Sequence, residues 1–398
     1  MNNRQGFLLH QAQTTHFPML LEIARGEGNY LYDVAGKKYL DLISGISVSH
    51  LGHGNERVKE AIVAQLDLHQ HVMVYGEFVQ SAQTQLATRL TGLLPASLDS
   101  VYLLNSGAEA TDLALKLAKR VTGKTAVVAC KNAYHGSSHA ALSLNGDEYY
   151  KQAFRPLLPG ISFIDFNQLE GLEKIDSNVA CVITEVVQGE AGYIPAELAF
   201  LKALRTKCDE VGALLVFDEI QSGMGKTGSI FAFEQYGIIP DILLLGKALG
   251  AGMPIGAVVS GKEKMDLLAD KPILGHITTF GGHPVIAAAA LAGINELLEG
   301  GYMETVAEKE MRFRKGLQHA AIKQIWGKGL MLAMELDSFE NTLLVVQSAL
   351  GLGLISDWFL FASNRVRIAP PLTITLEEID MACGILCKAL DEVYVNKP

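Results

Sequence analysis

A lysine that directly follows an apolar run is the side chain in this sequence best suited to covalent chemistry. Lys247 comes after PDILLLG and lies among glycines and alanines, so no neighbouring charge explains it as part of a solvated surface. Desolvation favours the neutral amine, which is the nucleophile that forms a Schiff base with an aldehyde. A lysine that extends from a strand end toward solvent is the structural alternative, and this motif alone does not decide between them.

An acid at the end of another apolar run is the second candidate. Asp218 ends ALLVF in the stretch GALLVFDEIQSGMGKTG. Ligands of open α/β sheets bind outside the carboxyl ends of the strands, so an acid at this point can reach a bound cofactor. A helix cap or a salt bridge would explain Asp218 equally well. It is therefore a candidate catalytic residue that needs support from the rest of the sequence.

A phosphate site is indicated at Ser106, Gly107 and Ala108, which follow the apolar run VYLL and open a predicted helix. The first N–H groups of a helix have no acceptor within the helix, and the helix dipole favours an anion there. The S-x-x-E spacing of Ser106 and Glu109 also predicts a capping box. Both interpretations hold together, because a capped helix still presents its first amides.

Two nucleotide-binding motifs are incomplete. GMGKTG ends like a Walker A loop, but the first glycine of that loop is replaced by Ile220. Gly250, Gly252 and Gly256 give G-x-G-x-x-x-G, which differs from the dinucleotide fingerprint and lies too far along the chain for a first βαβ unit. We therefore expect neither a P-loop nor a nicotinamide site.

The candidate residues need a sheet whose strand ends meet, and the middle of the chain predicts one. Between residues 101 and 260, short apolar runs are typical of strands covered on both faces: VYLL, TAVVAC, ISFI, VACVITEV, ALLVF, DILLL and GAVVS. Helical stretches separate several of them, as in a mostly parallel α/β sheet. After Ser106, small and apolar residues recur with helical spacing and predict one buried face: Ala110, Leu113, Ala114, Leu117 and Ala118.

Both ends of the chain have a different pattern. The stretch GEGNYLYDVAGKKYLDLISGISVSHLGHG alternates aromatic and β-branched residues with turn residues, as short antiparallel strands do. The last hundred residues mix amphipathic stretches with short strands such as GLMLAMEL and RVRIA. We predict a helix near residues 285–298, a large α/β domain at residues 50–290 and a small α+β domain from residues 1–49 and 291–398.

The charge balance favours small-molecule chemistry. The 398 residues carry a formal net charge of -10, which provides no electrostatic footprint for nucleic acid or an anionic membrane. The start lacks a basic region followed by a long apolar run, so we expect a cytoplasmic protein. Residues 242–260 come nearest to a membrane span, but a central lysine, four glycines and a proline favour strand, loop, strand.

The cysteines predict no disulfide framework and no metal site. They are scattered, with no C-x-x-C and no paired histidine spacing, at Cys130, Cys181, Cys208, Cys383 and Cys387. We therefore expect buried free thiols.

Motifs along nearly the whole chain resemble those of the class III aminotransferases, which are fold type I pyridoxal-phosphate enzymes. The matching stretches follow in family order: GNYLYDVAGKKYLDLISGISVSHLGHGN, NSGAEA, AYHG, EVVQGEAGYIPA, VFDEIQSGMGKTG, GKALGAGMPIGA, TTFGGHP and RIAPPLTIT. Each is weak alone, and their shared order and spacing carry the resemblance. It implies a large domain with a mostly parallel sheet covered by helices, pyridoxal 5'-phosphate as cofactor, and a homodimer with its sites at the interface.

The resemblance also implies roles for single residues. Lys247 would hold the cofactor as a Schiff base and move a proton, and Asp218 would keep the pyridine nitrogen protonated. Gly107 and Ala108 would bind the phosphate, and Thr279 would reach the phosphate of the other subunit's cofactor. The remaining cofactor-binding residues would surround the ring: Tyr134, His135, Gly136, Glu185 and Gln221.

Glu190 in QGEAG and Arg367 in RIAPPL match a pair known in the ω-amino-acid branch. There the two bind each other or leave the arginine free for an α-carboxylate, which a guanidinium binds with two parallel hydrogen bonds. An ordinary buried ion pair is the alternative for Arg367. The resemblance thus implies ping-pong transfer from an ω-amino acid or diamine derivative, as in the acetylornithine, ornithine and 4-aminobutyrate group, to a 2-oxo acid such as 2-oxoglutarate.

The sequence also departs from the family pattern. Ser137 and Ser138 follow the HG of the cofactor wall, where that branch commonly has an arginine, so a direct grip on the donor's carboxylate is not implied. Met224, Lys226 and His283 stand where the family usually has Phe, Arg and Asn, from which we expect an altered substrate preference.

Two other functions remain open at this point. An aminomutase or racemase on the same scaffold would also need Lys247 and Asp218, but it would use no external 2-oxo acid. A non-catalytic binding protein of this fold is disfavoured, because Gln221 and Thr279 are present together with Lys247 and Asp218.

Overall fold

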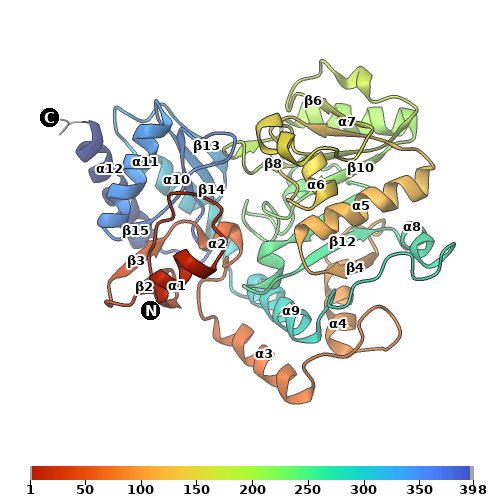
Figure 1. Cartoon of the computed structure of the whole chain (residues 1–398), viewed down its shortest axis with the longest axis horizontal. Coiled ribbons are helices and arrows are strands. Elements are labelled where there is room, and N and C mark those ends of the chain that lie inside the picture. Colours follow the sequence, from red (N-terminus) through yellow and green to blue (C-terminus); the bar gives the residue numbers. More distant parts are fainter. Residues whose placement is uncertain (1, 395–398) are drawn as a thin grey trace.

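A seven-stranded sheet forms the centre of the larger of two lobes (Figure 1). The computed structural model describes residues 2–394. The strands lie in the order β4 (Ser100–Leu104), β12 (Gly256–Ser260), β11 (Ile242–Gly246), β10 (Leu214–Asp218), β7 (Val179–Glu185), β5 (Ala126–Cys130) and β6 (Ile161–Ile164). Each run predicted from residues 101–260 forms one of these strands.

The direction of the strands confirms a mostly parallel α/β sheet. β12 runs antiparallel to β11 and β4, while β11, β10, β7, β5 and β6 run parallel to one another. Residues 242–260 form β11, a 3-10 turn at Lys247–Gly250 and β12, as predicted. No helix within residues 2–394 is long and apolar enough to cross a membrane.

Helix α5 (Gly107–Thr122) covers one face of this sheet and contacts β12, β11 and β7. The small and apolar residues predicted to form its buried face are all fully buried: Ala110, Leu113, Ala114, Leu117 and Ala118. α7 (Leu198–Val211) packs against β10 and β7 through its own buried side chains. The buried residues of α5 and α7 belong to different hydrophobic clusters, so the two helices cover opposite faces of the sheet.

The smaller lobe is α+β and combines both ends of the chain. β1 (Ile23–Glu27), β2 (Tyr30–Asp33) and β3 (Lys38–Asp41) are antiparallel, as predicted, and β15 (Leu354–Ile355) pairs in parallel with β3. A second antiparallel sheet contains β13 (Gln324–Lys328), β14 (Met331–Glu335) and β16 (Arg365–Ile368). The helices of this lobe are α10 (Val306–Gly316), α11 (Phe339–Gly351) and α12 (Leu376–Tyr394).

The predicted boundary at residue 290 falls inside a helix. α9 (Pro284–Glu299) packs against α3 (Glu56–Leu68) and α4 (Ser81–Thr91). The division of the chain at residues 50–290 therefore stays a prediction. The remaining short elements are α1 (Asn3–His10), α2 (Ser44–Ser47), α6 (His139–Ser143), α8 (Lys262–Met265), and the pair β8 (Val187–Gln188) and β9 (Ile194–Pro195).

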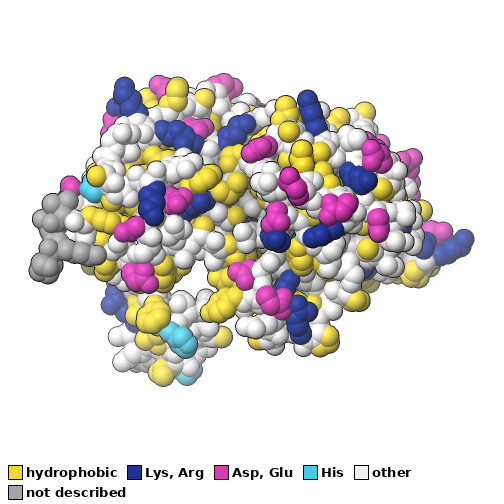
Figure 2. All heavy atoms as spheres, turned by 90° about the horizontal axis from the view of Figure 1, so that it is seen from above, with side chains coloured by type: hydrophobic (Ala, Val, Ile, Leu, Met, Phe, Trp, Pro, Cys, Tyr) yellow, Lys and Arg dark blue, Asp and Glu magenta, His cyan; other side chains and the backbone are white. Residues whose placement is uncertain are grey.

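All five cysteines are free, as predicted, and all but Cys387 are buried. Cys387 is partly exposed on α12. On the face shown in Figure 2, basic and acidic side chains are interspersed and neither sign forms a large patch.

Candidate active site

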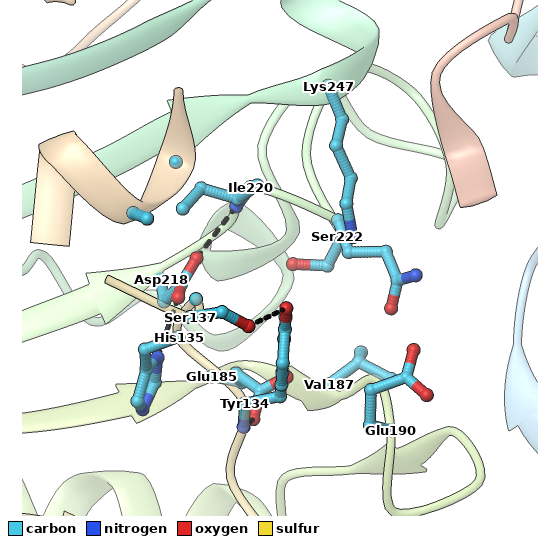
Figure 3. Close-up of a pocket in the computed structure, with 14 residues that line it drawn as sticks. Tyr134, His135, Ser137, Glu185, Val187, Glu190, Asp218, Ile220, Ser222 and Lys247 are labelled. Atoms are coloured by element: carbon cyan, nitrogen blue, oxygen red, sulfur yellow. Dashed lines mark hydrogen bonds and ion pairs between the residues drawn. The ribbon is translucent and has the colours of Figure 1, made fainter. Parts of the chain in front are cut away.

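Three neighbouring strands deliver the ionisable groups of the site to one edge of the sheet. β7 and β10 pair in register, so Glu185 lies beside Asp218 at their carboxyl ends. β11 lies on the other side of β10 and ends at Gly246, directly before Lys247. Lys247 has a φ of 45°, a left-handed conformation that costs free energy in a residue other than glycine. In Figure 3 its side chain extends into the pocket, with Tyr134 and Glu190 on the opposite side.

A cavity of about 210 Å³ brings together most of the predicted site residues. Its lining includes Gly107, Ala108, Tyr134, His135, Gly136, Glu185, Glu190, Asp218, Gln221 and Lys247. Three predicted residues lie elsewhere. Ser106 lies behind the helix start, Arg367 lines a neighbouring cavity, and Thr279 is exposed on the surface.

Asp218 is held by two hydrogen bonds. Its Oδ2 lies 2.7 Å from Nδ1 of His135, and its Oδ1 accepts from the N–H of Ile220 at 3.0 Å. Burial favours neutral His135, but the hydrogen bond and charge of Asp218 outweigh it and raise the pKa of the imidazole. His135 thus orients the carboxylate of Asp218 through this hydrogen bond. The sequence had suggested only that His135 completes the wall of the pocket.

Glu185 is a buried carboxyl group next to Asp218. Burial raises its pKa to about 7, and the charge of Asp218 adds to this effect while His135 opposes it. Its oxygens accept the N–H groups of Gly189 at 2.8 Å and Tyr134 at 3.3 Å. Glu185 therefore connects the loop that carries Tyr134 to the loop that carries Glu190.

Burial also prepares the amine of Lys247. It lowers the pKa of the ammonium group, although the negative charge of Glu190 acts in the opposite direction. A larger fraction of the side chain is therefore the neutral nucleophile near neutral pH.

The start of α5 is capped, but differently from the predicted capping box. Oγ of Ser106 accepts the N–H of Glu109 at 3.2 Å, which is the expected half of the motif. The carboxylate of Glu109 does not return to Ser106 and instead accepts the N–H of Asn105 at 2.7 Å. The predicted hydrogen bond from the N–H of Ser106 to Glu109 was therefore wrong. Asn105, which directly follows the end of β4 at Leu104, supplies the N–H instead. Gly107 and Ala108, the first two residues of the helix, both line the cavity, and the first N–H groups of a helix have no acceptor within it.

Three glycines allow residues of the cavity wall to pack closely. A Cβ on Gly107 would lie 2.7 Å from Ile220, and one on Gly136 would lie 2.6 Å from the side chain of Ala108. A Cβ on Gly189 would lie 2.0 Å from Oε1 of Gln221. Gly189 is a residue that the sequence reasoning missed, although it lies in the matched stretch EVVQGEAGYIPA.

Three residues that line the cavity each have a buried polar atom with no hydrogen-bond partner within the part of the chain that the structure describes. These atoms are Nε2 of His135, Nε2 of Gln221 and Oγ of Ser222. Buried polar groups in proteins are almost always satisfied, so these atoms indicate a polar ligand. Ser222 was not predicted, and its position directly after Gln221 was the available signal.

Arg367 lies in a network of partners beside the cavity. Its Nη2 donates to both oxygens of Glu190 at 3.1 Å, and its Nε donates to Oδ1 of Asp357 at 2.7 Å. Its Nη1 donates to the hydroxyl of Tyr193 at 3.2 Å. The Glu190 pair matches the prediction. Asp357 and Tyr193 were missed, because nothing in their local sequence points to Arg367.

A second cavity, of about 570 Å³, adjoins this network. Lys247, Tyr134 and Glu190 line it together with Asp357 and Arg367. Within residues 2–394 no group of three or more His, Cys, Asp or Glu side chains is placed to hold a metal ion. The groups of the two cavities that can take part in chemistry include Lys247, the carboxylates and the buried polar atoms without partners.

Comparison with known proteins identifies the family of this chain and the ligand that its cavity binds. The family described as Aminotransferase class-III matches residues 11–390. The chain belongs to the class-III aminotransferases. Among relatives of this class-III aminotransferase, the acetylornithine aminotransferase of Bacillus cereus is 38% identical over 93% of the chain and 95% of the relative. The [LysW]-aminoadipate semialdehyde/glutamate semialdehyde transaminase of Sulfurisphaera tokodaii is 37% identical over 94% of the chain and 95% of the relative.

Solved structures agree with this assignment. The ornithine aminotransferase from Toxoplasma gondii superposes with a TM-score of 0.91 and 30% identity, covering 98% of this chain and 94% of that one. An omega transaminase from Pseudomonas jessenii in complex with PMP superposes with a TM-score of 0.92 and 26% identity, covering 99% and 98%. The class-III aminotransferase described here is thus a pyridoxal-phosphate-dependent enzyme of fold type I.

The residues present fit that cofactor. Gln221 offers an unpartnered N–H group in the cavity, α5 offers its first amides to a phosphate, and Gly107 and Gly136 allow the close approach of Ile220 and Ala108 at the cavity wall. Asp218 offers a fixed carboxylate to a protonated ring nitrogen.

Proposed function

We propose that this class-III aminotransferase moves an amino group from an ω-amino acid or a diamine derivative to a 2-oxo acid such as 2-oxoglutarate in a ping-pong reaction. One observation carries the proposal. Lys247 and Asp218 extend from adjacent strand ends into a single cavity, at whose edge α5 begins with free N–H groups. The printed names of the relatives support the substrate class, because acetylornithine and the semialdehyde products are all ω-amino compounds or their oxo forms.

We assign a role in cofactor binding or proton transfer to each predicted residue of the site. When bound, pyridoxal 5'-phosphate supplies an aldehyde and an electron sink. Lys247 anchors it through Nζ and then carries a proton at that nitrogen. Asp218, oriented by His135, holds a proton at the ring nitrogen. The amides of Gly107 and Ala108 bind the phosphate, with Ser106 keeping the helix start in place.

The remaining predicted residues orient the ring. Tyr134 lies at the cavity wall, and its hydroxyl is 3.0 Å from Oγ of Ser137. Gln221 would donate through Nε2 to the phenolic oxygen, which would satisfy that buried atom. Glu185 keeps the loops of the wall together.

Arg367 is proposed to bind the α-carboxylate of the 2-oxo acid. It can do so only if that carboxylate replaces Glu190, since the side chain of Arg367 is 1% exposed and already paired. Exchange of one carboxylate for another keeps the buried guanidinium neutralised, which makes the exchange feasible.

We also propose a cytoplasmic homodimer with the site at its interface. Thr279 is exposed and does not line the cavities of its own chain, which is the placement that a residue serving the partner requires. Large apolar side chains are exposed around it and in a segment near residue 80: Ile277, Phe280, Phe78 and Val79. Such exposure is typical of a surface that another protein covers.

The test of the function is amino transfer by the holoenzyme from ornithine to 2-oxoglutarate, with glutamate as the measured product. Lys247→Ala should lower kcat by about a thousandfold or more, because both the anchor and the proton carrier are lost. Lys262→Ala, which removes an exposed ion pair with Asp266, is the matched control and should leave kcat unchanged.

Two results would contradict the proposal. One is undiminished glutamate formation by Lys247→Ala. The other is conversion of the amine without any added 2-oxo acid, which would indicate an aminomutase or racemase. Arg367→Ala should raise the KM for 2-oxoglutarate, and an unchanged KM would show that the acceptor binds elsewhere.

A further inference from the structure

The cavity beside Lys247 contains two carboxylates and one guanidinium. Arg367 donates to Glu190 at 3.1 Å and to Asp357 at 2.7 Å, and all of them line the cavity of about 570 Å³. Ionised, this triad carries one net negative charge. In the proposed function, Nζ of Lys247 serves the cofactor and the proton transfer, so we do not count it as a partner for a distal group of the substrate.

Asp357 has an oxygen left for a substrate. Its Oδ1 accepts from Nε of Arg367, whereas Oδ2 has no hydrogen-bond partner among the residues that the structure describes. The side chain is 22% exposed where the residue lines the cavity, so a substrate can reach it. Phe17 and Trp358 line the same cavity, and aromatic rings attract cations. A carboxylate next to aromatic rings is a typical environment for an ammonium group.

No other basic side chain balances this charge. Among the described residues that line either cavity, Lys247 and Arg367 are the only lysine and arginine. Ser137 occupies the rim position at which an arginine would stand in the related branch. Residues 69–80 and 274–284, which contain the exposed apolar side chains of the proposed interface, include no lysine or arginine, so the partner would not supply one through them.

We infer that Asp357 determines donor specificity by binding a distal ammonium group, so that this enzyme prefers diamines to donors with a distal carboxylate. The inference rests on the proposed function, because it concerns the donor of the same amino transfer. A distal carboxylate would meet the net negative triad and could pair with Arg367 only by displacing Glu190, and like charges at a desolvated site repel each other strongly.

The experiment compares three donors of equal chain length with the holoenzyme and one common acceptor, pyruvate. Cadaverine ends in an ammonium group, pentylamine in a methyl group and 5-aminopentanoate in a carboxylate. After correction for its two equivalent amines, cadaverine should exceed pentylamine in kcat/KM by about tenfold, the size expected of one charge-assisted hydrogen bond. 5-Aminopentanoate should rank below pentylamine.

Asp357→Asn isolates the charge. Asparagine keeps the shape and an oxygen for Nε of Arg367, so the ratio of cadaverine to pentylamine should fall to about one. Any effect on the acceptor cancels in this ratio, because both donors share the second half-reaction. Asp266→Asn, which removes a surface carboxylate paired with Lys262, is the matched control and should keep the wild-type ratio.

The outcomes distinguish the inference from the function on which it rests. Equal ratios in wild type and Asp357→Asn, or 5-aminopentanoate as the best donor, would overturn the role of Asp357 and leave aminotransfer intact. Transfer from none of the three donors, nor from ornithine, would contradict the proposed function and this inference with it.

Discussion

Arg367 illustrates how burial constrains a single residue. A guanidinium that is almost fully removed from solvent must be paired, and here Glu190, Asp357 and Tyr193 pair it. The structure shows the buried ion pair of Arg367 with Glu190. That an incoming carboxylate takes the place of Glu190 remains our proposal.

Ser137 allows a prediction at the same scale. Ser137→Arg would place a cation at the rim of the first cavity, where Ser137 is exposed beside Tyr134. We expect kcat/KM for 5-aminopentanoate to rise by about tenfold, because the distal carboxylate gains a bidentate partner. Ser137→Gln, which is long but uncharged, is the control in the same donor assay. A rise in both variants would show that size and not charge limits this donor.

Pairing of parallel strands explains the site at the scale of elements. β7, β10 and β11 end at one edge, so residues from distant parts of the chain meet there. The loop after β10 also reaches the smaller lobe. Nζ of Lys226 donates to the carbonyls of Ala369 at 3.2 Å and Pro370 at 2.5 Å, directly after the strand that carries Arg367. Lys226 thus connects the two elements that hold Asp218 and Arg367.

The lowered pKa of the buried Lys226 leads us to predict that the stability of the fold depends on pH. Burial lowers its pKa from 10.5 to about 7, and the charge of Asp41 opposes this only in part. Between these values the unfolded chain binds more protons than the folded one, so the free energy of unfolding rises as pH increases from about 7 to 10. Lys226→Met removes this titration, and the rise should shrink by on the order of 3 kcal/mol.

Thermal unfolding of the holoenzyme at both ends of that pH range measures the effect. The lost hydrogen bonds to Ala369 and Pro370 lower stability equally at every pH, so only the slope reports on the titration. Lys262→Met, at an exposed ion pair, should keep the wild-type slope. Parallel slopes for wild type and Lys226→Met would mean that Lys226 stays protonated throughout.

At the scale of the whole molecule, exposed apolar side chains near Thr279 lead us to predict a dimer interface. Val79 is 94% exposed and Phe280 is 54% exposed, next to Thr279. Replacing both Val79 and Phe280 by glutamate should convert a dimer into monomers, because two charges would be buried without partners. Cofactor affinity should fall by about tenfold as well, since the phosphate loses Thr279 of the other subunit.

Light scattering and cofactor titration check these two effects. Met311→Glu, at a position 64% exposed on α10, is the control and should remain dimeric. A wild-type protein that is monomeric at all concentrations would contradict the proposed interface. A dimer of the double variant with unchanged cofactor affinity would place the interface elsewhere.

Local sequence patterns were enough to predict the strands of the central sheet, helix α5 and the candidate catalytic residues. The period of apolar residues predicted the strands of the central sheet and the buried face of α5, because burial of one face or both is a property of neighbouring residues. Lys247 and Asp218 were recognisable for the same reason, since each directly follows an apolar run. The order of the family motifs extended this to pyridoxal phosphate.

Tertiary structure alone decided which partners these residues have. Asp218 is bonded to His135, 83 positions away, and Arg367 to Glu190, 177 positions away. The family resemblance indicated the second pair, whereas neither the first pair nor the place of Asp357 beside Arg367 has a signal in the sequence. Such contacts depend on strand order and on the packing of two lobes, which no local spacing encodes. The sequence thus determined the chemistry available to this enzyme, and the packing decided the charge that its substrate meets.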